Sequence, residues 1–392
     1  MIERDGGGAT GSTGARTNWR GESANHTMEK HATPIAFLID SLSFGGAERQ
    51  LSLLVRALPE PFKPVVISLS GDIDPFGKEL QSRGIDVVAI ERRSHVDLRR
   101  LREAARVIRA RKADIVHGFL DAANAYAFVS GRVLRKPVVL SLRNEVLRLS
   151  GAKGTALSWM LRHADRILVN SHNGADFLRN RIGVLERNIV HIPNWVDPDR
   201  VGRVRDIPPP GAAATAIGFV GRFAKQKRVD LLVEAFHAVR RRVPDARLIL
   251  MGDGAERGEI VTRVERLGLT PYVEFVAPNP DVDATLRRID VFVLTSAFEG
   301  LPNAAIEALS MGIPVVSTAV GDIGELIIPG KTGALFENDR PDSMADTLVR
   351  VLADRSLLEN AARFGPKLVE ERFSLSRAVE RLTAVYRSLL VR

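Results

Sequence analysis

The stretch that decides the fold is residues 290–309, which read DVFVLTSAFEGLPNAAIEAL. It begins with an apolar run typical of a buried strand and passes through a loop that contains Gly300 into a helical pattern. Pro302 stands where proline favours the first turn of a helix. Strand, glycine loop and helix in this order form the repeating unit of a parallel sheet, whose ligands bind at the carboxyl ends of the strands. The two carboxylates of the segment, Glu299 and Glu307, are therefore expected at a ligand site.

The same alternation of apolar runs and amphipathic helices continues on both sides of this segment. We expect strands at 35–40, 64–70, 86–90, 114–119, 137–142, 166–171 and 189–193, and then at 216–220, 247–251, 273–277, 290–296, 314–318 and 333–337. Near-continuous apolar strands of this kind belong to parallel sheets that are covered by helices on both faces. The sequence predicts an α/β protein with two Rossmann-like, doubly wound domains that face a central cleft.

Three consecutive prolines within residues 206–215 separate the two halves of the chain. We divide the chain into a disordered tail, a first domain, a linker, a second domain and a final helix, with the boundaries 1–32, 33–207, 208–215, 216–375 and 376–392. The tail is expected to be disordered because its Gly, Ser, Thr and charged residues cannot offset the entropy of ordering. The final amphipathic helix either caps the second domain or crosses back to the first.

The composition excludes several classes of protein. None of the 392 residues is cysteine, which excludes disulfides, thiolate nucleophiles and zinc–cysteine sites. No apolar stretch approaches the length of a membrane-spanning helix, and no secretory signal is expected, so we predict a cytoplasmic protein. The net charge of +9 favours a polyanionic partner, which can be nucleic acid, an anionic membrane or a phosphorylated small molecule.

A cluster of cations follows the first strand of the second half. Its members precede a helix and are Arg222, Lys225, Lys227 and Arg228. A helix N-terminus disfavours positive charge, so this placement makes sense if an anion binds there. Arginine holds phosphate oxygens as a planar fork and lysine as a point charge. The alternative is a solvated basic turn.

The corresponding loop of the first half is residues 43–49, SFGGAER. Its two glycines allow the backbone to approach a ligand, and the helix that follows offers free N–H groups to an anion. The alternative is an ordinary turn. Beside such anion sites, Glu299 and Glu307 would accept hydrogen bonds from sugar hydroxyls. Without a ligand role, Glu299 would be a surface residue, and Glu307 would be a carboxylate that the helix dipole favours.

In its ordered set of motifs the chain resembles the family 4 retaining glycosyltransferases of the GT-B fold. The matching residues of the second half are GFVGR at 218–222, Lys227, EGLPN at 299–303 with Glu307, GIPVV at 312–316, Gly321 with Glu325, and GKTG at 330–333. Those of the first half are GGAE at 45–48 and IPNWVD at 192–197. The likeness spans about residues 34–390 and implies transfer of a sugar from a nucleotide-sugar donor.

The resemblance also implies roles for these positions. Arg222 and Lys227 would bind the diphosphate and stabilise it as leaving group, and Glu299 would contact the hydroxyls of the donor sugar; these three are the expected catalytic residues. Glu307 would hold the ribose hydroxyls. The other donor-binding positions would approach sugar or phosphate chiefly through the backbone, and they are Gly46, Gly300, Leu301, Pro302 and Asn303. No divalent metal and no cofactor are implied, because cations and helix dipoles supply the charge stabilisation.

The end of the fifth strand of the first domain departs from the family pattern. Many relatives place a histidine there, whereas this chain has Arg143, followed by Asn144 and Glu145. Arg143, Asn144 and His117 are candidates for contact with the acceptor or a phosphate, although a satisfied core histidine is the preferred explanation of His117. Glu145 is a candidate base. We assign no general base, because in a retaining transfer the leaving phosphate oxygen can take the acceptor's proton.

Residues 92–112 hold nine Lys or Arg against two acidic residues. They form either the solvated face of a helix or a surface attracted to an anionic inner leaflet, at roughly 1 kcal/mol per basic residue. The second possibility would suit a lipid-linked acceptor, which many relatives use. Nucleic acid is not expected as a partner, because no aromatic side chain is interleaved with the run.

The sequence thus predicts a retaining glycosyltransferase of the hexosyltransferase class. It would move a sugar from a nucleotide-diphosphate sugar, with UDP-sugar favoured, to a glycan or lipid-linked acceptor in bacterial cell-surface polysaccharide or glycolipid synthesis. The first domain would bind the acceptor and the second the donor, at the inner membrane face. Two alternatives stay open: a GT-B nucleotide-sugar epimerase or hydrolase, and a catalytically silent subunit that binds a sugar nucleotide.

Overall fold

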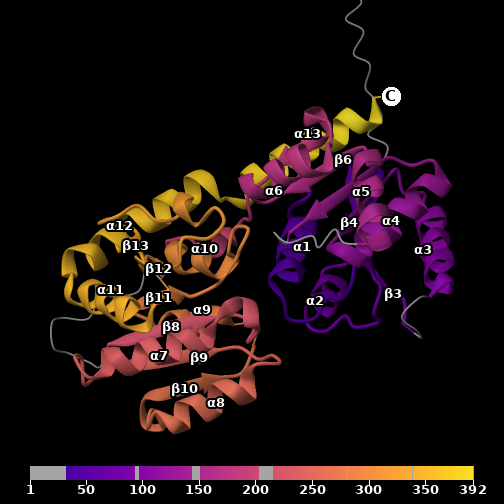
Figure 1. Cartoon of the computed structure of the whole chain (residues 1–392). Coiled ribbons are helices and arrows are strands. Elements are labelled where there is room, and N and C mark those ends of the chain that lie inside the picture. Colours follow the sequence, from indigo (N-terminus) through magenta and orange to yellow (C-terminus); the bar gives the residue numbers. More distant parts are fainter. Residues whose placement is uncertain are drawn as a thin grey trace, which may run out of the picture. The chain divides into compact units, whose positions relative to one another are not determined.

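The computed structural model describes residues 32–92, 97–143, 151–202, 215–279, 281–337 and 339–391. It contains two parallel β-sheets with helices between consecutive strands (Figure 1). The expected tail lies outside these residues except for Ala32, and the expected linker lies outside them except for Thr215.

The first sheet has seven strands in the order β3-β2-β1-β4-β5-β6-β7. The strands are β1 (Thr33–Ile39), β2 (Phe62–Ser68), β3 (Asp86–Ala89), β4 (Ile115–Phe119), β5 (Val138–Leu142), β6 (Arg166–Val169) and β7 (Ile189–His191). The helices are α1 (Gly46–Ala57), α2 (Phe76–Ser82), α3 (Leu98–Ala110), α4 (Asp121–Leu134), α5 (Gly151–His163) and α6 (His172–Phe177). This order is that of a doubly wound sheet, whose ligand position lies at the carboxyl ends of β1 and β4.

The second sheet has six strands in the order β10-β9-β8-β11-β12-β13. The strands are β8 (Ala216–Val220), β9 (Arg247–Met251), β10 (Val273–Val276), β11 (Val291–Leu294), β12 (Val315–Ser317) and β13 (Gly333–Leu335). The helices are α7 (Val229–Arg240), α8 (Arg257–Arg266), α9 (Val282–Leu286), α10 (Asn303–Ser310), α11 (Pro341–Ala353) and α12 (Arg355–Arg372). The neighbours β8 and β11 bring the two loops that follow them to the same edge of the sheet.

Each expected strand is present; β8 and β9 have the expected ends, and the ends of the others differ by at most two residues. The reason is that the central strands are buried on both faces, so their sequences are almost wholly apolar and easily recognised. The first helix begins at Gly46, two residues before the start near Glu48 that the sequence indicates. The first sheet separates two apolar clusters, one on each face, whereas one large cluster surrounds the second sheet.

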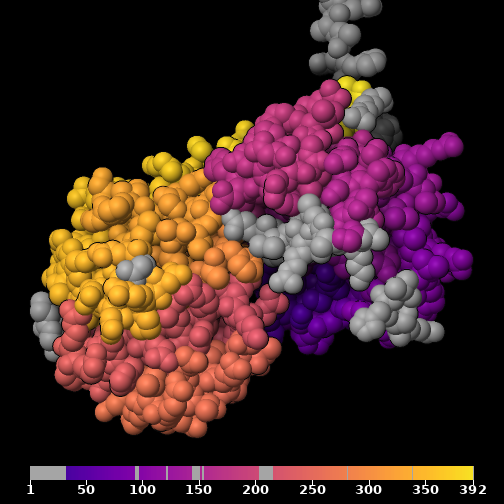
Figure 2. Space-filling model, in the orientation of Figure 1, coloured from indigo at the N-terminus to yellow at the C-terminus, as the bar shows by residue number. Residues whose placement is uncertain are grey.

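The last helix, α13 (Leu375–Leu390), packs in the core of the first domain although it follows the second in sequence. Its buried residues Leu382, Tyr386 and Leu389 belong to the cluster that also contains Phe37 and Phe62. In Figures 1 and 2 the yellow end of the chain lies beside the magenta elements of the first domain. The helix therefore crosses back, and it covers the first sheet together with α1 and α2.

Within the described ranges no helix combines the length and apolar character that crossing a membrane requires.

Candidate functional site

The loops after β8 and β11 are joined by hydrogen bonds at the carboxyl edge of the second sheet. Thr295 Oγ1 donates to the carbonyl oxygens of Lys227 and Arg228, each at 2.9 Å. Gln226 accepts a bond from the Ala297 amide at 2.8 Å and donates one from its side chain to the Phe298 carbonyl at 2.8 Å. These bonds bring the cationic loop beside the loop that carries Glu299.

Glu299 and Lys227 form a charge pair at the centre of this edge. Glu299 is 8% exposed, and its Oε1 accepts hydrogen bonds from Lys227 Nζ and, at 2.6 Å, from Ser296 Oγ. A buried carboxylate of this kind needs a cation and further hydrogen bonds to offset its lost hydration. The pair places a carboxylate and an ammonium group in direct contact. Such a site suits a ligand that carries both hydroxyls, which the carboxylate can bind, and phosphate, which the ammonium group can bind.

Glu307 lies one turn into α10 and is held by arginines of the first half. It is 9% exposed, and its Oε1 lies 3.0 Å from an Arg200 guanidinium nitrogen and 3.7 Å from Arg49 Nε. Arg200 is 3% exposed and also contacts Asp283 at 2.6 Å. The sequence interpretation missed both arginines. Arg49 stands at the end of the singled-out segment 43–49, but no local signal marks Arg200.

The N-termini of α1 and α10 meet across the site. A Cβ atom at Gly46 would lie 2.5 Å from Asn303 Nδ2, so only glycine permits this approach without displacing the amide. Neither helix has a side-chain cap, because Gly45 and Pro302 occupy the cap positions. Uncapped N–H groups at a helix N-terminus favour an anion. Asn303 Oδ1 is buried without a hydrogen-bond partner among the described residues and can accept a bond from a ligand.

Two family models match these same halves. The one described as Glycosyltransferase Family 4 matches residues 44–200, and the one described as Glycosyl transferases group 1 matches residues 214–354. The chain belongs to the family 4 glycosyltransferases. The family predicted from the sequence motifs is thereby confirmed.

Curated relatives of this glycosyltransferase include a polysaccharide biosynthesis protein and a glucosyltransferase. The Vi polysaccharide biosynthesis protein VipC/TviE of Salmonella typhi is 34% identical over 157 residues, which are 40% of this chain and 25% of that protein. The 2-deoxystreptamine glucosyltransferase of Streptomyces kanamyceticus is 28% identical over 242 residues, 59% of this chain and 62% of that protein. The matched stretches thus span a quarter to about three fifths of these relatives.

The fold is shared with solved glycosyltransferase structures. HepE of Anabaena, in complex with UDP-glucose, superposes with a TM-score of 0.79 at 20% identity, over 91% of this chain and 99% of that one. This likeness confirms the predicted GT-B architecture of two Rossmann-like domains.

Asn194 connects Arg143 of the glycosyltransferase to the loop that carries Glu299. Its Nδ2 donates to the Leu301 carbonyl at 2.6 Å, and its Oδ1 accepts from Arg143 at 2.7 Å and from Asn170 at 3.2 Å. Burial lowers the pKa of Arg143 to about 10, and the Trp195 ring lies 4.7 Å from its guanidinium carbon. Arg143 thus orients the Asn194 side chain through this hydrogen bond. Sequence reasoning missed both asparagines, although Asn194 lies within the motif at 192–197.

The structure describes His117, but not Asn144 and Glu145, of the other residues expected at the acceptor side. His117 is fully buried, and its two ring nitrogens contact Tyr386 at 2.7 Å and Ser141 at 2.9 Å. This arrangement favours the core histidine over an acceptor contact. Burial holds the pKa of His117 well below its usual value, with a further contribution from Arg143. Asn144 and Glu145 lie outside the described residues.

Arg222 is exposed and interacts electrostatically with Glu48 of α1. Burial raises the pKa of Glu48, Asp40 raises it further, and the positive charge of Arg222 opposes them. Arg222 therefore lies within electrostatic range of the first helix. Arg228, by contrast, pairs with Asp339 at 2.6 Å.

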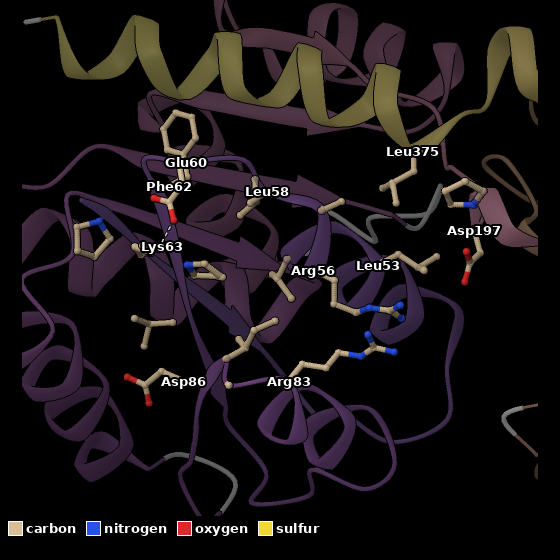
Figure 3. A pocket seen from close by; sticks show the side chains of 18 of the residues that line it. Leu53, Arg56, Leu58, Glu60, Phe62, Lys63, Arg83, Asp86, Asp197 and Leu375 are labelled. Atoms are coloured by element: carbon tan, nitrogen blue, oxygen red, sulfur yellow. Dashed lines mark hydrogen bonds and ion pairs between the residues drawn. The ribbon is translucent and has the colours of Figure 1, made fainter. Parts of the chain in front are cut away.

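A cavity of about 720 Å³ lies elsewhere, against α1, β2 and the start of α13 (Figure 3). None of the donor-binding residues expected from the sequence lines it. Of its three arginines, Arg56 and Arg83 contact Glu79 at 2.9 and 3.3 Å, and Arg111 contacts Asp86 at 2.5 Å. Because these charges are paired, the cavity attracts an incoming anion less strongly than the two uncapped helix N-termini do.

Proposed function

We propose that this glycosyltransferase transfers a hexosyl group from a nucleotide-diphosphate sugar, with retention of configuration, to a glycan or lipid-linked acceptor of cell-surface polysaccharide or glycolipid synthesis. The observation that carries the proposal is the meeting of two uncapped helix N-termini beside the Lys227–Glu299 pair. A diphosphate fits the N–H groups and cations, and a sugar fits the carboxylate and the unpartnered Asn303 oxygen. UDP is the favoured nucleotide, in keeping with the UDP-glucose bound to HepE.

In the proposed reaction the bond between the sugar's anomeric carbon and the diphosphate oxygen breaks, and a bond to the acceptor oxygen forms on the same face. The acceptor's proton passes to the departing phosphate oxygen, so no side-chain base is required. Lys227, Arg222 and the helix N-termini stabilise the negative charge that gathers on the diphosphate. Glu299 orients the sugar hydroxyls and Glu307 the ribose. These groups take the place of a divalent metal, and the nucleotide-sugar is a substrate, so no cofactor is needed.

A thermal-shift panel of UDP, GDP, ADP and their sugars tests the donor site. A ligand at 100 times its dissociation constant stabilises the folded state by about 2.7 kcal/mol, so binding of one nucleotide gives a clear shift. Arg222→Ala is expected to lose that shift, whereas Arg241→Ala, an exposed arginine of the same domain, retains it. A panel without any shift contradicts the donor site, and a shift without any turnover favours the silent subunit. Release of nucleotide without an acceptor identifies the hydrolase or epimerase.

We also propose that the enzyme works in the cytoplasm at the inner face of the membrane. The support is α3, where Arg102, Arg106 and Arg109 are exposed; Arg100, in contrast, is buried and bonds the Leu69 carbonyl at 2.5 Å, so it is not available to lipid.

Sedimentation with vesicles tests this placement. We expect binding to anionic vesicles and none to neutral ones. The triple variant R102Q/R106Q/R109Q should lower the binding on the order of 100-fold, at roughly 1 kcal/mol per basic residue. Equal partitioning of the wild type between the two vesicle types would reject the membrane placement and leave the donor site unaffected.

A further inference from the structure

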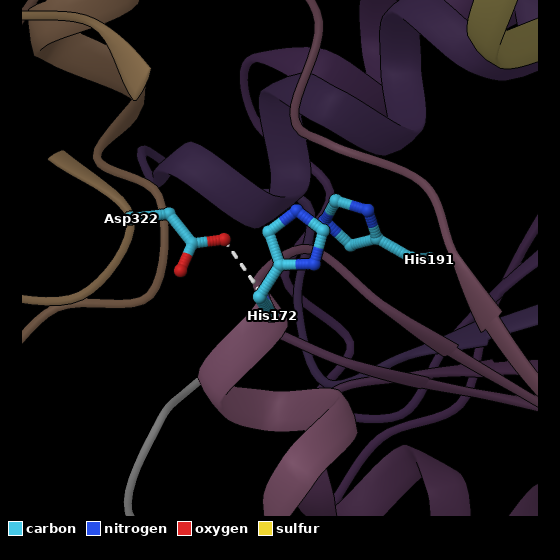
Figure 4. Close-up of side chains that lie close together, drawn as sticks. All are labelled: His172, His191 and Asp322. Carbon is cyan, nitrogen blue, oxygen red and sulfur yellow. Dashed lines mark hydrogen bonds between the residues drawn. The ribbon is translucent and has the colours of Figure 1, made fainter. Parts of the chain in front are cut away.

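A second group of chemically active side chains lies outside the Lys227–Glu299 pair. His172 begins α6, directly after β6, and His191 ends the neighbouring strand β7, while Asp322 lies in the loop after β12. One ligand atom of each residue lies within 4.8 Å of the others, and the two imidazole centroids are 4.2 Å apart. Figure 4 shows the His172 ring between the Asp322 carboxylate and the His191 ring. We call these three residues the His–His–Asp cluster.

His191 presents a nitrogen that has no partner in the described structure. Its Nε2 is buried from solvent and makes no hydrogen bond to the described residues. With the ring proton on Nδ1, Nε2 offers its lone pair to a ligand. A buried polar nitrogen without a partner is costly, so this position calls for a ligand.

His172 is oriented by two carboxylates. Its Nε2 lies 2.9 Å from Glu325 Oε1, and its backbone N–H donates to Asp322 Oδ2 at 2.6 Å. When Nε2–H donates to Glu325, the lone pair of the ring is on Nδ1. A carboxylate that bonds the distal nitrogen of an imidazole is the usual arrangement behind a metal-bound histidine, because it fixes the tautomer and raises the basicity of the ligand.

We propose that the His–His–Asp cluster binds one divalent transition-metal ion, with zinc favoured. Two imidazole nitrogens and one carboxylate oxygen are a donor set that suits Zn²⁺, whereas Mg²⁺ and Ca²⁺ prefer oxygen ligands alone. Zinc with bonds of about 2.0–2.1 Å needs tetrahedral ligand atoms roughly 3.4 Å apart. The His172 side chain, 64% exposed, has the freedom to close the remaining gap. A water molecule completes the fourth position.

The ion would connect the first domain to the loop that carries Glu299. The Asp322 amide donates to the Gly300 carbonyl at 2.9 Å. A metal ion bound by the Asp322 side chain is therefore held by a residue that bonds directly to the loop of Glu299. Its role is structural: it holds α6 and β7 against this loop and takes no part in the transfer step. The site and its test do not depend on the proposed function, because metal binding is measured without any sugar nucleotide.

Calorimetric titration of the full chain with zinc chloride, after removal of metal by a chelator, tests the site. We expect one tight site in the wild type. Substitutions His172→Ala and His191→Ala should each weaken it on the order of 100-fold, and Glu325→Gln by about 10–100-fold. His163→Ala is the matched control, since this exposed histidine of α5 stacks on Trp159 and is outside the cluster. The tail histidines His26 and His31 remain in every variant, so their binding contributes equally.

The outcomes separate cleanly. Absence of a tight zinc site, or affinity unchanged in His172→Ala and His191→Ala, overturns the proposal. If the variants fail to fold, the wild type loaded with Co²⁺ decides the question: intense visible absorption of four-coordinate cobalt supports the site, and the weak absorption of a six-coordinate ion contradicts it. Zinc should also raise the melting temperature of the wild type and leave that of His172→Ala unchanged.

Discussion

Lys227→Ala is expected to lower kcat/KM for sugar transfer by about 100- to 1000-fold, the loss typical of one preorganised group that stabilises developing negative charge. In the proposed reaction this charge gathers on the diphosphate, and Lys227 lies in the loop that faces it. Its present partner is the Glu299 carboxylate, so binding of the donor would let the lysine share its charge between carboxylate and phosphate. Steady-state kinetics with the nucleotide-sugar identified by the thermal-shift panel measures the loss.

The same substitution also affects stability, and this effect must be separated from catalysis. Without Lys227, the Ser296 hydroxyl is the side-chain partner that the buried Glu299 carboxylate keeps among the described residues, and a buried charge without a counter-ion is costly. The double variant Lys227→Ala/Glu299→Gln removes both charges and should recover unfolding free energy without recovering activity. Lys367→Ala, at an exposed position of α12, is the control. Activity within a factor of two of the wild type in Lys227→Ala would remove this lysine from the proposed mechanism.

The strands and the loops that carry Lys227 and Glu299 could be predicted from the sequence because their signals are local. A strand buried on both faces is apolar over its whole length, and a glycine–proline loop after it is visible within ten residues. The pairing of Lys227 with the loop of Glu299 also follows, since loops after strands of one parallel sheet share an edge. Their hydrogen-bond partners within each loop were not predictable in detail.

The contacts that could not be predicted join residues far apart in the sequence. Asn194 reaches the Leu301 carbonyl across 107 positions, and His117 meets Tyr386 across 269. A histidine in a strand carries no local sign of whether it faces a site or the core. Whether His117 faces the core depends on α13, which returns to the first domain and supplies the Tyr386 hydroxyl. Arg200 was missed for the same reason, because both of its carboxylates belong to the other half of the chain.

Gly321→Ala is expected to cost about 2–4 kcal/mol of unfolding free energy, the sum of left-handed backbone strain and overpacking. Gly321 has a φ of +51°, and a Cβ atom there would overlap the carbonyl oxygens of Glu299 and Gly300. These are backbone atoms, so no side chain can turn aside to make room. Relief requires the whole loop to move, which also breaks the bond from the Asp322 amide to the Gly300 carbonyl.

Displacement of this loop should impair the site as well as the fold. The loop carries Glu299 and leads into α10, so we expect the donor affinity of folded Gly321→Ala to fall at least tenfold, together with the zinc affinity of the His–His–Asp cluster. Urea unfolding and calorimetry measure the two effects separately. Gly324→Ala is the matched control three residues on, since a Cβ atom there meets nothing within 4 Å. It should stay within about 0.5 kcal/mol of the wild type. Equal stability of both variants would show that the loop tolerates a side chain at Gly321 and would contradict this packing.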